Sequence, residues 1–343
     1  MRKYITQKKW KKYLLNRSKQ NSKRKNKKKD SKIKVLPKSY EPILAKTKFK
    51  NYFELKAPQN FDLIKNTDEV LKFFRESTED QKDRKKTFLN LENITTLSSD
   101  AITLLASFFN DKKFHHNVEA VGNAPKDPKI RQMFLQSGFY NFVTSRGPKK
   151  TLEENILHRE TDTKILPKIA KNATINGVKY TYGKERNHLT EPIYNIIIEA
   201  MSNTNNHANL DEEKKINWWL FCHFDQELCK ASYTFLDLGV GIFESIPVRQ
   251  FFNLKRSIGI DSNLSLVPDL LSGKIGSRKE EDKEIRGKGI PEMIKHAQNK
   301  EIDNFYIITN NIKINMKTME AILLTEELKG TLIHWELKSN HGS

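Results

Sequence analysis

Residues 191–208 read EPIYNIIIEAMSNTNNHA, and the interpretation of the C-terminal half of the chain starts from this stretch. Its apolar residues recur at helical spacing, so one face of the predicted helix is apolar throughout: Ile193, Ile197, Ala200 and Met201. A helix with such a stripe buries it against another layer of structure. The stretch therefore predicts a helix packed on a sheet.

The polar face of this helix carries a carboxylate and an amide one turn apart. Thr190 is expected to cap the helix, with Pro192 in the first turn, where its missing N–H costs nothing. Glu199 and Asn203 are four residues apart and lie one above the other, and His207 continues the line. An amide oxygen is a ligand for Mg²⁺, and a carboxylate can orient or deprotonate a water molecule. The pair suits nucleotide chemistry, although the same spacing also occurs on solvated helices.

A predicted strand over residues 232–238 ends in a second polar feature. Asp237 stands at the strand end, and glycines follow at positions 239 and 241. Glycine lets a flat ligand approach the backbone closely, and the carboxylate can accept a hydrogen bond from the exocyclic amine of adenine. A tight turn between two elements is the alternative interpretation of these residues.

A third feature is the run Arg286, Gly287, Lys288 and Gly289, which opens a predicted helix. Glycines at a helix start expose backbone N–H groups and the positive end of the helix dipole, which together bind phosphate. The two basic side chains add charge. Residues 259–284 before this run are polar and irregular, and we expect them to form a mobile lid. A solvated basic loop is the alternative.

In this order the three features, with a fourth near the C-terminus, resemble the motifs of the GHKL ATPase superfamily. That superfamily includes gyrase, the heat-shock chaperone ATPases, mismatch-repair ATPases and sensor histidine kinases. The matching segments are E-x-x-x-N at 199–203, D-x-G-x-G at 237–241, G-x-G at 287–289 and a Gly-Thr pair at 330–331. The resemblance implies an α/β fold in which residues 148–343 form a layered sandwich, with helices covering one face of a mixed sheet.

The resemblance also implies a role for each matching residue. Glu199 would be the general base, and Asn203 would hold Mg²⁺ beside ATP. Asp237 would bind the adenine amine, with Thr331 assisting through a water molecule. The other candidates would contact the base, ribose or phosphates of the nucleotide: His207, Gly239, Gly241, Arg286, Gly287, Lys288 and Gly289. Leu238 replaces the asparagine common in the second motif, a departure expected to leave adenine recognition intact and to remove one contact on the Mg²⁺ or phosphate side.

Three classes of function use such a site. The first, which we favour, is a Mg²⁺-dependent ATPase with slow hydrolysis, in which lid closure drives a dimerisation or conformational switch. The second is a protein kinase. His158 lacks the apolar helix that follows the phosphoacceptor of histidine kinases, so a serine kinase of the anti-sigma type, acting on Ser98 or Ser99, is preferred within this class. The third is a nucleotide sensor or scaffold without turnover.

Residues 46–147 alternate short strand and helix patterns, which predicts a small α/β domain. The expected elements are helices over 67–76, 100–109 and 129–137 and strands over 87–91 and 118–121. The segment NLENITTLSSDAITLL at 90–105 resembles the STAS domain, a regulatory α/β module, and this resemblance implies a protein partner.

Two serines in that segment are candidate modification sites. Ser98 and Ser99 stand where anti-sigma-antagonist STAS domains carry a phosphorylated serine. Leu97 and Asp100 replace the aspartate and glycine that usually flank it. Capping of the following helix explains the serines equally well.

The N-terminus carries most of the net charge of the protein. Residues 1–39 contain 17 Lys or Arg and a single acid, Asp30, so 16 of the 19 net positive charges lie there. Such a block is expected to be disordered in isolation and to attract nucleic acid. A solubilising or partner-binding extension is the alternative. The predicted organisation is a basic tail over 1–45, the STAS-like domain over 46–147 and the ATPase domain over 148–343.

The rest of the composition excludes other classes. The chain has no apolar stretch of 18 residues and no secretory signal, so we expect no membrane span and a cytoplasmic location. Two cysteines are too few for a disulfide framework.

Residues 148–189 are expected to hold the first strand of the ATPase domain and a connector, with an edge hairpin over 177–183. A homodimer is a further expectation from the GHKL resemblance.

Overall fold

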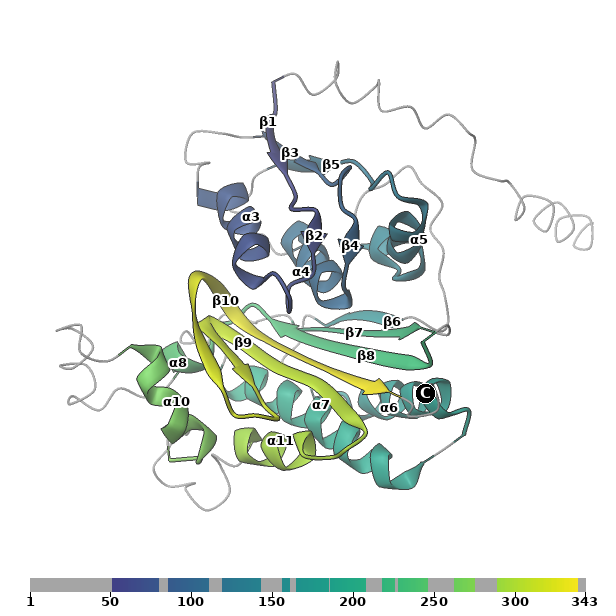
Figure 1. Cartoon of the computed structure of the whole chain (residues 1–343), viewed down its shortest axis with the longest axis vertical. Helices are drawn as coiled ribbons and strands as arrows, with labels where there is room; N and C mark the ends of the chain where they lie inside the picture. The colour runs from purple at the N-terminus through teal and green to yellow at the C-terminus, as the bar shows by residue number, and fades with distance from the viewer. Residues whose placement is uncertain are drawn as a thin grey trace, which may run out of the picture. The chain divides into compact units, whose positions relative to one another are not determined.

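The fold is described by a computed structural model (Figure 1), which covers residues 51–79, 86–110, 119–142, 156–160, 165–184, 186–207, 218–225, 228–245, 262–274 and 289–338. The chain divides into two units, residues 1–50 and residues 51–343, and every described element belongs to the second. The fold class is α/β with both parallel and antiparallel sheets, as expected. Within the described ranges, no helix is long and apolar enough to cross a membrane.

The elements follow the chain in two groups. The strands are β1 (Phe53–Lys56), β2 (Asn60–Phe61), β3 (Lys86–Asn90), β4 (Thr96–Leu97), β5 (Glu119–Gly122), β6 (Ile156–Glu160), β7 (Trp218–Asp225), β8 (Lys230–Asp237), β9 (Ile302–Asn315) and β10 (Ala321–Lys338). The helices are α3 (Thr67–Glu79), α4 (Ser99–Asn110), α5 (Pro128–Gln136), the 3₁₀ turn η2 (Phe139–Asn141), α6 (Pro167–Tyr182), α7 (Asn187–His207), α8 (Ile242–Ser245), α10 (Asn263–Leu271) and α11 (Gly289–Ala297).

The C-terminal group is built on a five-stranded sheet in the order β6-β7-β8-β10-β9. All four neighbouring pairs are antiparallel, whereas a mixed sheet was expected here. The reason is that β10 returns from β9 and inserts between β9 and β8, which run in the same direction. The parallel pairs lie instead in the N-terminal sheets β1-β3-β5 and β2-β4.

Each face of the five-stranded sheet is covered by a different layer. Because side chains alternate along a strand, Phe235 and Ile333 face α6, α7, α10 and α11, while Leu236 and Leu332 face the N-terminal elements. The second core also holds Phe61 and other residues of α3 and α4. In Figure 1 the sheet accordingly lies between α6, α7 and α11 on one side and the N-terminal elements on the other.

The predicted N-terminal elements form, and their ends follow the expected capping. The Ser98 hydroxyl accepts a hydrogen bond from the Ala101 N–H at 3.4 Å, as a cap of α4. Asp127 caps α5 through the N–H groups of its second and third residues, and Gly138 follows α5 with φ 75°. Helices and strands predicted from periodicity over 67–137 are therefore confirmed to within a few residues.

The predicted hairpin over 177–183 is wrong, because these residues are the last turns of α6. The buried residues of α6 follow helical spacing, but most are small: Ala170, Ala173, Thr174, Gly177, Val178 and Thr181. Gly177 is required by a close approach, since a β-carbon there would lie 1.6 Å from the Tyr233 hydroxyl. Gly183 ends the helix with φ 70° and donates its N–H to the Lys179 carbonyl at 2.8 Å.

Two further expectations near the site need correction. α7 begins at Asn187, and the Thr190 hydroxyl donates to the Arg186 carbonyl at 3.1 Å, so Thr190 is a helical residue and not the cap. The proposed lid contains α10, whose Val267 and Leu270 are buried in the core, so this part is packed structure. Residues 275–288 lie outside the described part of the chain.

Candidate functional site

Asp237 is the last residue of β8 and lies on the helical face of the sheet. Its side chain is buried, with Oδ1 accepting the Gly239 N–H at 2.9 Å and Oδ2 accepting the Thr204 hydroxyl at 3.3 Å. Burial raises the pKa of Asp237 to about 6, against the opposing effect of hydrogen bonds from Gly239, Thr204 and the Thr331 backbone. A buried carboxylate ionised at pH 7 is a strong hydrogen-bond acceptor.

Residues 238–243, which follow Asp237 and which we call the glycine loop, are held by two residues of β9. The Thr309 hydroxyl accepts the Ile242 N–H at 2.8 Å and donates to the Gly330 carbonyl at 3.0 Å. The Asn310 amide accepts the Phe243 N–H at 3.2 Å and donates to the Val240 carbonyl at 3.0 Å. Adjacent side chains of one strand thus fix the loop at three backbone positions.

Two glycines allow this arrangement. Gly241 has φ 82°, and a β-carbon there would lie 2.4 Å from Oδ1 of Asn310. Gly330 has φ 129°, and a β-carbon there would lie 2.0 Å from the Asp237 carbonyl oxygen. A side chain at position 330 would displace the Asp237 backbone, and one at position 241 would displace the Asn310 amide and strain the local backbone. These contacts explain Gly241 of the second motif and Gly330 of the fourth.

The first and third motifs meet where α11 begins beside α7. A β-carbon on Gly289 would lie 3.0 Å from Oε2 of Glu199 and 3.4 Å from the side-chain amide of Asn203. Both side chains therefore project toward the N-terminus of α11. Burial, and secondly the charge of Glu292, raise the pKa of Glu199 above its ordinary value.

Helix α7 links the two ends of the site. Thr204, which binds Asp237, directly follows Asn203, which lies against Gly289. The structure thus brings together Glu199, Asn203, Asp237, Gly239, Gly241, Gly289 and Thr331, all of them sequence-predicted site residues. The side chain of His207 and all of Arg286, Gly287 and Lys288 lie outside the described part of the chain.

Sequence reasoning missed three residues that shape the site: Thr204, Thr309 and Asn310. Thr204 carried a weak signal, as a threonine one turn after a buried alanine on the apolar side of the helix. Residues 309–311, with the sequence TNN, carried a stronger one, because they interrupt an otherwise apolar strand with polar residues. Neither signal identifies its partner without the strand order.

The residues of the kinase alternatives lie elsewhere. The backbone of His158 is in strand β6, paired with Leu220, and not in a helical hairpin. Ser99 is buried on the opposite face of the sheet from Asp237, with its hydroxyl 3.3 Å from that of Thr234. Ser98 caps α4 beside it.

Comparison with known proteins does not identify the chain. No protein-family model matches the sequence, and no curated protein matches it either. The described residues contain no group of three or more His, Cys, Asp or Glu side chains arranged to hold a metal ion.

Proposed function

We propose that the chain binds ATP together with Mg²⁺ at this site and hydrolyses the nucleotide slowly. The main support for the proposal is that two neighbouring residues of α7 contact the two ends of the site. Thr204 binds the buried Asp237, and Asn203 faces Gly289, which opens α11. An acceptor for a base at one end and a helix N-terminus for phosphates at the other suit a nucleotide between them.

The residues at the base end fit adenine. An ionised Asp237 can accept the exocyclic amine, which guanine lacks at the equivalent position. The loop over 239–241 carries no side chain at positions 239 and 241, which leaves backbone open to a flat ligand. Thr331, directly opposite Asp237 on β10, has a hydroxyl that can act as a donor, within 3.3 Å of the Thr309 hydroxyl.

The residues at the phosphate end fit a magnesium-bound triphosphate. Mg²⁺ in such sites takes one or two protein oxygens and completes its shell with phosphate and water, so a single amide such as Asn203 is an adequate protein ligand. When bound, the ion would neutralise charge on the phosphates. The absence of a β-carbon at Gly289 leaves room beside Asn203 and exposes the first N–H groups of α11.

Glu199 is suited to the role of general base. Its raised pKa makes it a stronger proton acceptor than an ordinary glutamate. It stands one helical turn before Asn203, on the side of α7 that faces α11. In this position it would orient a water molecule toward the terminal phosphate and accept its proton.

Transfer to a serine of the same molecule has less support. Ser99, the first residue of α4, is buried against the face of the sheet opposite Asp237, with its hydroxyl next to that of Thr234. Phosphorylation of Ser98 or Ser99 by the same molecule would require those elements to leave the sheet. Hydrolysis needs no such rearrangement.

Two glutamate-to-glutamine variants of α7 test the proposal. In Glu199→Gln we expect phosphate release to fall at least about 100-fold, with ATP affinity within about threefold of wild type. Glu191→Gln, which alters an exposed residue near the start of α7, is the control and should retain turnover. Equal turnover in wild type and Glu199→Gln would remove Glu199 from the mechanism.

A further inference from the structure

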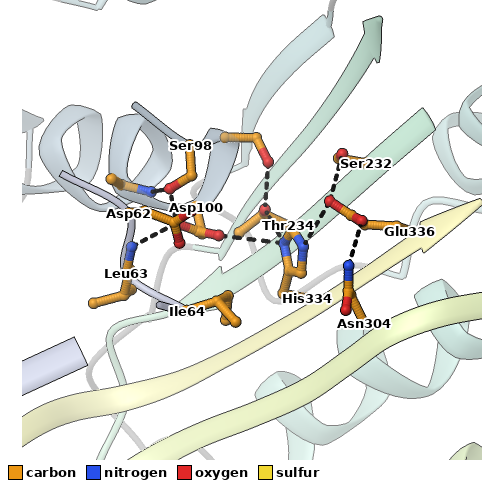
Figure 2. A network of polar contacts seen from close by, with 12 residues as sticks. Asp62, Leu63, Ile64, Ser98, Asp100, Ser232, Thr234, Asn304, His334 and Glu336 are labelled. Carbon is orange, nitrogen blue, oxygen red and sulfur yellow. Dashed lines mark hydrogen bonds and ion pairs between the residues drawn. The ribbon is translucent and has the colours of Figure 1, made fainter. Parts of the chain in front are cut away.

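A buried polar cluster lies between the sheet and the N-terminal elements, on the face opposite Asp237. We define this interface cluster as Ser99, Asp100, Thr234, His334 and Glu336 (Figure 2). Ser99, Asp100, Thr234 and His334 are each no more than 5% exposed. The cluster is bordered by apolar residues such as Leu236 and Leu332 and by polar residues such as Asp62 and Ser232. Because buried polar groups are costly unless paired, their partners fix how the two layers fit together.

Asp100 provides the contact from the N-terminal side. It lies in the first turn of α4, where Oδ1 accepts the Leu63 N–H at 3.1 Å and the Ser98 hydroxyl. Oδ2 is 3.5 Å from Nδ1 of His334. Burial raises the pKa of Asp100, while the neighbouring His334 acts in the opposite direction. The Asp100 carboxyl group therefore reaches the sheet through its contact with the His334 imidazole of β10.

His334 and Thr234 carry the contact into the sheet. Nδ1 of His334 is 3.2 Å from the Thr234 hydroxyl, and Nε2 is 3.7 Å from Glu336. Glu336 also accepts hydrogen bonds from Lys230 at 2.8 Å and Ser232 at 3.3 Å. Burial alone would raise the pKa of Glu336, but His334 and Lys230 outweigh it and hold the pKa well below its usual range.

The same two strands carry the candidate nucleotide site. His334 is paired with Thr234 across β10 and β8, and Thr331 is paired with Asp237 three residues further along. An odd spacing places the second pair on the other face of the sheet. A shift of these strands that changes one pair must move the other, because both belong to one hydrogen-bonded ladder.

We propose that Asp100 is a positioning residue for the nucleotide site, acting through His334 and Thr234. Packing of the N-terminal elements on one face and ligand binding on the other are then coupled, and each strengthens the other to the same degree. The ligand in this statement rests on the proposed function. The coupling between the two faces does not, and it can be measured without nucleotide.

Amide hydrogen exchange of the full-length protein tests this coupling. Asp100→Asn keeps an acceptor for Leu63 but removes the charge opposite His334. Without nucleotide, we expect it to accelerate exchange in the segment 236–243 about 5- to 10-fold, as typical coupling energies imply. His334→Gln also alters the contacts with Thr234 and Glu336, so it should accelerate exchange at least as much. The double variant should add little to His334→Gln alone, because the contact between Asp100 and His334 is already lost.

The control breaks a different contact between the same layers. Arg75 of α3 pairs with Glu326 of β10 at 2.6 Å, beyond the bulge that separates Glu326 from Thr331. Arg75→Gln should accelerate exchange near Glu326 only. Unchanged exchange over 236–243 in Asp100→Asn, or the same acceleration there in Arg75→Gln, would overturn the coupling.

Exchange measured with ATP and Mg²⁺ distinguishes a failure of the coupling from a failure of the proposed ligand. In wild type, ATP with Mg²⁺ should slow exchange over 236–243 and also around residues 98–101, and Asp100→Asn should abolish the second effect. If ATP protects neither segment while the variants still accelerate exchange over 236–243, the proposed ligand is wrong and the coupling stands. Protection of 236–243 without any effect at 98–101 counts against the coupling.

Discussion

Thr331, within β10, and Asp237, the last residue of β8, are direct cross-strand neighbours, with Gly330 packed against the Asp237 backbone. The last and the second of the four sequence motifs therefore form one structural feature. The Thr331 backbone helps to stabilise the Asp237 carboxylate, against a burial that raises its pKa to about 6. The ionised form of Asp237 is therefore less stable than that of an exposed aspartate. Carboxylates of this kind are common where a ligand supplies a missing partner.

The raised pKa of Asp237 predicts a pH-dependent stability difference. Its pKa is higher folded, at about 6, than the ordinary 3.8, so its contribution is fully present below about pH 4 and lost as the pH rises through 6. Asp237→Asn is neutral throughout. We expect the variant to gain up to roughly 3 kcal/mol of unfolding free energy relative to wild type between pH 4 and pH 8. Urea unfolding at the two pH values measures it, and an equal difference at both would contradict the assignment.

The hydrogen bonds of Asn310 predict a loss of both stability and binding. Asn310→Ala leaves the buried Phe243 N–H and the half-buried Val240 carbonyl without their partner and places alanine at φ 51°. Unfolding free energy should fall by roughly 2–4 kcal/mol, and ATP affinity by at least about tenfold. Asn311→Ala is the control, since the Asn311 side chain accepts a hydrogen bond from Asn263 of α10 at 2.8 Å instead of bonding the loop as Asn310 does. Equal affinity in the two variants would show that the loop is not part of the site.

Gly289 offers a variant that separates turnover from stability. Gly289→Ala places a methyl group 3.0 Å from Glu199, yet alanine suits a helix start as well as glycine does or better. We expect phosphate release to fall about tenfold, with unfolding free energy unchanged or up to about 1 kcal/mol higher. Gly183→Ala should show the reverse, because the strain at φ 70° costs stability far from the site. Normal turnover in Gly289→Ala would argue against catalysis beside that glycine.

The basic tail predicts salt-dependent binding of nucleic acid. Removal of residues 1–39 takes away 17 of the 61 Lys and Arg residues, and we expect it to abolish retardation of DNA or RNA in gels at low salt. ATP turnover of the truncated protein is the control for folding. Retardation that persists without these residues would assign nucleic-acid binding to another part of the chain.

Local sequence signals predicted the elements and motifs that depend on short spacings. α7, the strand ending at Asp237 and the helix opening at Gly289 were all placed from such signals, and the structure brings their site residues together. The hairpin over 177–183 failed because alternating Val178, Tyr180 and Tyr182 also fit a helix whose buried residues are mostly small. Apolar periodicity gives no clear answer in such a case.

The rest depends on strand order, which one sequence does not reveal. Asn310 and Thr309 reach the glycine loop because β9 lies beside β10, and β10 beside β8. Asp100 meets His334 because the N-terminal elements pack on the outer face of the same sheet. Asn310 and its partners in the loop are 67 and 70 residues apart in the chain, and Asp100 and His334 are 234 residues apart, so neither contact could be inferred from local spacing.

Calorimetric titration of the intact protein with ATP and Mg²⁺ is the most direct test of the central claim that Asp237 recognises an adenine nucleotide. We expect binding heat in wild type at pH 7.5 and its loss in Asp237→Ala. Asn311→Ala, as the matched control, should retain the heat. No heat in the wild type, or the same heat in wild type and Asp237→Ala, would contradict the account.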